Sequence, residues 1–145
     1  MSKSNAFETA FLNLVFTNAN IANVGDATGL RGSSTAGNLH LSLHTASPGE
    51  AGAQNTSEVA YTGYARVQIG RSGSNFTVSG NSVSLAADAV FPAGTGGSGT
   101  ATHWGIGTDA SGAGTLLYYG AISPSIVCGN GVTPRLTAGT LVTED

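Results

Sequence analysis

The segment Leu39-His40-Leu41-Ser42-Leu43-His44-Thr45 alternates large apolar and polar residues without a break. Successive side chains of a β-strand point to opposite faces, so this period of two predicts a strand with its leucines on one face. The pattern predicts Leu41 in the core and Ser42 on the solvent face. An aspartate at position 41 would therefore bury an unpaired charge, whereas one at position 42 should be tolerated.

More strand patterns follow this segment, separated by turn signals such as Ser47-Pro48-Gly49 and Gly129-Asn130-Gly131. They lie at 64–70, 75–79, 82–86, 101–107, 114–122 and 135–143. Short strands at this spacing, with no helical pattern between them, predict a mainly β fold. We expect an antiparallel β-sandwich or jelly roll.

One segment before the strands, residues 5–17, has the period of a helix instead. Asn5, followed three residues later by Glu8, has the form of a capping box. The large apolar residues that share one helical face are Phe7, Phe11, Leu14 and Val15. Leu12 and Phe16 widen the apolar surface, so either the chain's own sheet or another protein must cover this helix.

Residues 18–38 connect the helix to the first strand and consist mainly of small and polar residues. A connection this long is either functional or disordered, so we expect a contact arm or a disordered segment. These features divide the chain into a helix and arm at 1–38 and a β-sandwich domain at 39–145. Because the arm has few large apolar residues, the chain without residues 1–37 should still fold.

The composition excludes several classes of function. The length of 145 residues suits one domain, and only 9% of them are charged, against roughly 25% in typical soluble proteins. So few charges favour a chain packed against neighbours, although a β protein coated with Ser, Thr and Asn would look the same. A net charge of −3 without a basic stripe argues against direct nucleic-acid binding. No apolar run reaches the length of a membrane span and no leader sequence is evident, so we expect no membrane contact and synthesis in the cytoplasm.

The motifs that could carry chemistry are weak. His40 and His44 have the zinc-binding spacing of a helix, but on a strand they stand about 13 Å apart, so we expect no metal. The glycines of 94–99 match a dinucleotide fingerprint, yet a strand follows them, which favours a flexible hairpin loop and no cofactor. Cys128 is expected to be a small buried residue. We therefore expect no catalytic residue and no enzymatic activity.

Two adjacent tyrosines, Tyr118 and Tyr119, occur in a predicted strand. Neighbouring residues of a strand point to opposite faces, so one ring should lie outside or at an interface. We therefore take Tyr118 and Tyr119, together with the apolar face of the helix, as candidate partner contacts.

Several motifs occur in a fixed order along residues 7–145. They are NLHLSLHTASPGEAG at 38–52, EVAYTGYAR at 58–66, VFP at 90–92, THWGI at 102–106, LLYYGA at 116–121, and TPRLTAG at 133–139 followed by Leu141. As an ordered set they resemble a family of small virion proteins of tailed phages. The resemblance implies a structural role in the particle, either as head decoration or in a tail fibre or tail tip, and implies no catalytic residues.

Three hypotheses follow. The first is a cement protein on the outer surface of the phage head, whose partners are the major capsid protein and copies of itself, because one compact domain with an arm suits that task. The second is a tail fibre or tail-tip module that binds a host surface through loops such as 46–57 and 94–100. The third, a hydrolase acting on host envelope polymer, has the least support because no site is evident.

Overall fold

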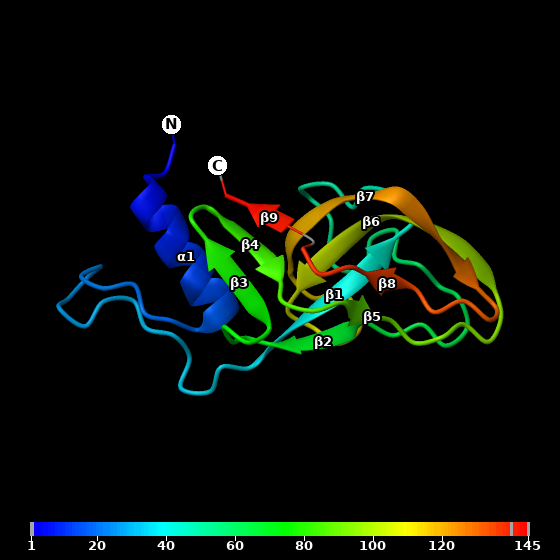
Figure 1. The fold of residues 1–145 in the computed structure, drawn as a ribbon, viewed down its shortest axis with the longest axis horizontal. Helices are drawn as coiled ribbons and strands as arrows, with labels where there is room; N and C mark the ends of the chain where they lie inside the picture. Colours follow the sequence, from blue (N-terminus) through cyan, green and yellow to red (C-terminus); the bar gives the residue numbers. More distant parts are fainter. Residues whose placement is uncertain (1, 140, 145) are drawn as a thin grey trace. The chain divides into compact units, whose positions relative to one another are not determined.

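The computed structural model of the protein describes residues 2–139 and 141–144. Antiparallel sheets and one N-terminal helix form a mainly β fold (Figure 1), which confirms the predicted class. The elements are α1 (Asn5–Thr17), β1 (Asn38–His44), β2 (Val67–Gly70), β3 (Phe76–Ser79), β4 (Ser82–Leu85), β5 (Ala89–Val90), β6 (Ser98–Gly107), β7 (Leu116–Gly129), β8 (Arg135–Leu136) and β9 (Leu141–Thr143).

The chain forms two compact units. Unit 1 contains the residues up to 38, those from 70 to 87 and those from 137 onward, while unit 2 contains 39–69 and 88–136. One boundary between the two units therefore falls between Asn38 and Leu39, where the apolar pattern of the sequence changes to the alternation of a strand. The division into a helix and arm at 1–38 and a β-sandwich domain at 39–145, with a shortened chain that still folds, stays a prediction. The predicted strand at 135–143 is two strands, β8 and β9, in different units, and Thr140 between them lies outside the described residues.

Helix α1 has the predicted bounds, Asn5–Thr17, but its N-cap lies one residue before the predicted Asn5. Ser4 is the N-cap, and its side-chain oxygen accepts a hydrogen bond from the backbone N–H of Phe7. Glu8 then lies one position beyond the capping-box position, so the predicted pairing of Asn5 with Glu8 is wrong. Asn18 ends the helix with a left-handed backbone, φ 61°, a conformation that asparagine tolerates better than most residues.

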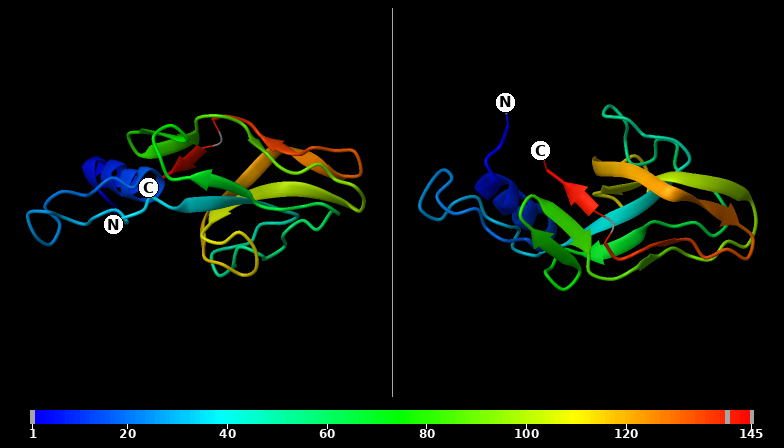
Figure 2. Two further views of the ribbon diagram at one scale, coloured as in Figure 1. Left: turned by 90° about the horizontal axis from the view of Figure 1, so that it is seen from below. Right: turned by 45° about the horizontal axis from the view of Figure 1, so that its top comes forward.

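Within unit 1, helix α1 packs on the sheet β3-β4-β9, as both views in Figure 2 show. Leu12 and Phe16 are buried, and the Phe16 ring meets Phe76 edge to face at a centroid distance of 5.0 Å. Thr9 Oγ1 donates to the carbonyl oxygen of Gly80 at 2.7 Å. The chain's own sheet therefore covers one face of the helix. The predicted stripe, which is Phe7, Phe11, Leu14 and Val15, is the less buried face.

The connection between α1 and β1 is a hairpin-like arm. Ile21 and Leu30 exchange both backbone hydrogen bonds, at 2.8 and 2.9 Å. The tip between them is closed by Asp26, whose carboxylate accepts from the hydroxyl and backbone N–H of Thr28, and these bonds lower the pKa of Asp26. The side-chain amide of Asn18 donates to and accepts from the Ser33 backbone. Paired contacts of this kind give the arm a defined conformation.

The main sheet of unit 2 has the order β2-β1-β6-β7. Its register places Leu41 opposite Ile106 and Leu43 opposite Trp104. These side chains are buried, with Leu43 fully inaccessible, so the leucine face of β1 lies in the core as predicted. The short sheet of β5 and β8 contributes Ala89 and Leu136 to the same unit's buried residues.

Candidate functional site

The second face of β1 is buried as well, which the sequence did not predict. Ser42 and His44 both have 0% exposure. His44 Nδ1 donates to the carbonyl oxygen of Thr56 at 2.8 Å, so in the neutral ring Nε2 accepts from Ser42 Oγ, also at 2.8 Å. The prediction that Ser42 lies on the solvent face is therefore wrong, because the loop after β1 covers this face, and an aspartate at position 42 is now expected to be destabilising.

Glycines of β6 make room for this polar layer. A Cβ atom on Gly105 would lie 2.7 Å from His44 Nε2 and 2.9 Å from Ser42 Oγ. A Cβ on Gly107 would lie 2.5 Å from Gln54, which is fully buried. Gln54 Nε2 donates to the His40 carbonyl at 2.9 Å, and its Oε1 accepts from the Asp109 N–H at 3.1 Å. Gln54 thereby fixes the loop 45–58 and the loop after β6 to the sheet.

The pair Ser42 and His44 has the hydrogen-bond geometry of a nucleophile and its base, but the surroundings differ from those of an active site. Neither side chain has any surface that a substrate could reach. Burial lowers the pKa of His44, so the ring is held neutral. The arrangement serves to satisfy buried polar groups.

The motif at 58–66 forms an ion-pair cluster in which Arg66 is buried and Glu58 and Tyr64 are half-buried. Arg66 donates to both carboxylate oxygens of Glu58, at 2.7 and 2.8 Å, and the Tyr64 hydroxyl donates to Glu58 Oε1 at 2.7 Å. Arg66 also donates to the carbonyls of Asp109 and Gly112. The hydrogen bond with Glu58 raises the pKa of Arg66, and burial raises that of Tyr64. A bidentate pair with this many satisfied donors holds the loop 109–112 against the segment 58–66.

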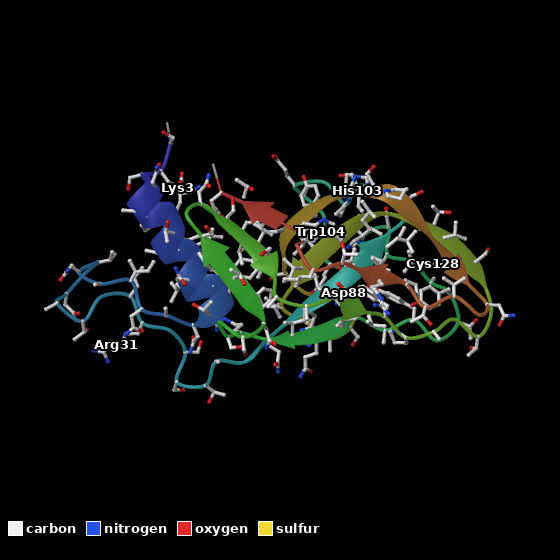
Figure 3. All side chains as sticks on the ribbon, viewed as in Figure 1. Lys3, Arg31, Asp88, His103, Trp104 and Cys128 are labelled. Carbon is white, nitrogen blue, oxygen red and sulfur yellow. The ribbon has the colours of Figure 1, made fainter. Side chains whose placement is uncertain are left out.

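His44 and His103 lie opposite each other on β1 and β6, whereas His40 lies opposite Gly107. His40 Nδ1 is 3.1 Å from the Thr108 carbonyl, whereas His44 bonds to Thr56. Figure 3 labels His103, which shares a hydrogen bond with the Thr102 hydroxyl. Among residues 2–139 and 141–144, no three His, Cys, Asp or Glu side chains are grouped so as to hold a metal ion.

The glycine-rich segment 94–99 leads into a strand, β6, as the sequence predicts, and its first residues make backbone hydrogen bonds to Thr62. Thr62 donates its N–H to the Gly96 carbonyl and accepts from the N–H of Thr95, both at 2.9 Å. A Cβ on Gly94 would lie 2.0 Å from the Gly129 carbonyl oxygen. The glycine is thus required by the close approach of two backbone segments.

Cys128 is buried as predicted, and burial raises the pKa of its thiol.

The predicted contact residues lie on two surfaces, one in each unit. On α1, Phe7 is 40% exposed and its ring lies 6.3 Å from that of Phe11. Leu14 and Val15 are half-buried, and their backbone carbonyls accept from the Arg71 guanidinium.

The other surface is the strand β7, whose exposure alternates as predicted. Tyr119 is 37% exposed while Tyr118 is half-buried. The sequence reading missed Leu117 and Val127 on the same strand, of which Val127 is 67% exposed. It also missed Val24 and Leu30 of the arm, which carries Arg31 (Figure 3). Alternation gives a residue's face, but exposure depends on which loops cover that face.

No helix in the described part of the chain has the length and apolar character to cross a membrane. No curated protein matches the sequence. The model of the family described as podophage GP4 fiber I protein gp80 matches residues 2–144, nearly the whole chain. The chain therefore belongs to this family and is a structural protein of a bacteriophage particle.

Proposed function

We propose that the protein is a component of a phage fibre, with no enzymatic activity, that contributes to attachment of the particle to a host surface. The observation that carries this proposal is the family match over residues 2–144, because the family is described by a podophage fibre protein. The fibre reading was the second hypothesis from the sequence, and the family description favours it over the head-cement hypothesis.

The side chains support a structural role. The residues with the most potential for chemistry, Ser42, His44, Glu58 and Arg66, are occupied in networks that hold loops on the main sheet. The exposed side chains of the strand β7 and the arm include large apolar residues instead. Apolar and aromatic side chains on a surface of low charge suit contacts with other proteins.

No internal repeat is evident in the sequence, but this does not oppose a role in a fibre. A fibre can contain a small module beside longer subunits, and such a module needs no repeat of its own. The fibre hypothesis first assigned host binding to the loops 46–57 and 94–100, but both loops are held by contacts with the rest of unit 2. The segment 94–97 is tied to Thr62, and the loop 46–57 contains the buried anchor Gln54. We therefore place attachment on the arm and on exposed side chains of β7.

The location of the protein in the particle tests this proposal. Antibodies raised against the purified chain and labelled with gold should mark the tail fibres of intact particles in electron micrographs. Quantitative mass spectrometry should find few copies per copy of the major capsid protein. Label distributed over the head, with a copy number comparable to that of the capsid protein, would instead establish a cement role.

A further inference from the structure

The strand β7 is a long sheet edge without charged residues. It contains 14 residues, Leu116–Gly129, and is the outermost strand of the sheet β2-β1-β6-β7. None of these residues is Asp, Glu, Lys or Arg. Edge strands are usually protected from pairing with other chains by charged residues, short length, bulges or proline. Of these protective features β7 has only an irregular pairing with β6 and one proline. The backbone N–H and C=O groups of its regularly paired stretches are therefore available to another strand.

The irregularity has a defined position. The pairing of β6 with β7 shifts between Ala101 and His103, which leaves the residues between Ala121 and Ile126 out of register, and Pro124 lies among them. On either side, Tyr119 to Ala121 and Ile126 to Cys128 pair regularly with β6. A regular strand from another protein would meet proline, which lacks an N–H, in the middle of its ladder.

From this arrangement we propose that β7 pairs with β7 of a second copy of the chain, antiparallel, about a two-fold axis next to Pro124. In this register Ala121 lies opposite Ile126 of the second copy, and Tyr119 opposite its Cys128. Each irregular segment then faces the identical segment of the other copy, and both regular runs form ladders. An isologous contact of this kind is self-complementary and closes after two copies.

The register also matches the side chains. His103 pairs with Ala121 and Ala101 with Ile126, and residues two apart on β6 share a face. Ala121 and Ile126 therefore lie on the same face of the sheet, as directly opposed residues of one continuous sheet must. The exposed side chains of Tyr119 and Val127 lie on opposite faces, so the seam would gain apolar cover on both.

Sedimentation velocity of the full-length chain over a range of concentrations tests the association. We expect a reversible dimer, and a dissociation constant at least about tenfold larger when Tyr119→Lys and Val127→Lys are combined, because both charges then lie on the edge strand, where charged side chains oppose pairing with another strand. The control is Leu30→Lys combined with Val24→Lys, which places the same charges on exposed apolar residues of the arm. A wild-type chain that stays monomeric at every concentration, or equal weakening by both pairs, would overturn the proposal.

Cysteine crosslinking tests the register with milder substitutions. Oxidation of a mixture of Ala121→Cys and Ile126→Cys chains should give a disulfide-linked pair that contains one of each, since directly opposed residues have the Cα separation of a disulfide. Dimers formed by either variant alone in equal yield would refute this register. Both experiments use the purified chain, so their outcome is independent of whether the particle carries the protein on a fibre or on the head.

Discussion

Ser42 shows how a single residue on a strand can depend on a distant loop. Its hydroxyl is inaccessible and donates to His44, so Ser42→Asp should bury a carboxylate against a ring whose charged form is disfavoured by burial, and destabilise the fold by more than about 3 kcal/mol. Ser98→Asp is the matched control, because Ser98 lies exposed in the same sheet and should change stability by less than about 0.5 kcal/mol. Urea unfolding of the two variants measures the difference, and equal losses would contradict the burial of Ser42.

His44 should make stability depend on pH. Burial lowers its pKa below the ordinary 6.5, so between the two values the unfolded chain binds more protons than the folded one. The contribution of His44 to stability is therefore complete above pH 6.5 and decreases as the pH falls below it. Urea midpoints measured at neutral pH and at about pH 5 should show this loss. In His44→Gln the loss should be smaller, and an unchanged pH dependence in that variant would assign the effect to another group.

At the scale of elements, the end of α1 is held by a residue far along the chain. The Arg71 guanidinium donates to the carbonyls of Leu14, Val15 and Ala36, so it caps the helix and fixes the arm together. A cation at a helix C-terminus also interacts favourably with the helix dipole. Arg71→Ala should lower the free energy of unfolding of unit 1 by about 1.5–3 kcal/mol.

Hydrogen exchange can locate that effect. Amide protection in α1 and in residues 33–37 should decrease in Arg71→Ala, while amides of β1 and β6 in unit 2 should keep their rates. Arg31→Ala is the control, because Arg31 lies in the arm and donates to the Thr28 hydroxyl close by. Similar effects of both variants would mean that Arg71 acts only through its charge.

The elements also show how far the sequence could predict the fold. The strict alternation at 39–45 and the helical spacing at 5–17 each gave the correct element within one residue, because both patterns are local. The burial of the polar face of β1 was not predictable, because it depends on Gln54 and on glycines at 105 and 107. The same holds for the candidate contacts. Tyr119 could be predicted as a contact residue because it is adjacent to Tyr118 and must point to the opposite face. The exposure of Val127 could be predicted only if β7 were known to be the edge strand of the sheet.

At the scale of the whole molecule, the N-terminal segment contributes to the core of unit 1, whereas unit 2 is expected to fold without it. Helix α1 covers Phe76 in unit 1 with Leu12 and Phe16, and these residues are buried. The segment therefore has two roles, since one face of the helix completes unit 1 while the arm and the Phe7 side remain exposed. A chain without residues 2–37 should keep the fold of unit 2, but β3 and β4 would lose their apolar cover.

Trp104 is the one tryptophan of the sequence and lies buried in unit 2, so its fluorescence reports on that unit alone. In the shortened chain we expect a native Trp104 emission maximum together with binding of a hydrophobic dye to the uncovered sheet. Phe16→Ala in the full-length chain is the milder variant. It should cost about 3–5 kcal/mol in unit 1, seen as faster hydrogen exchange of α1, β3 and β4, with the same emission maximum. If Trp104 becomes solvent-exposed in the shortened chain, the two units fold as one, and the division at residue 38 would have no meaning for stability.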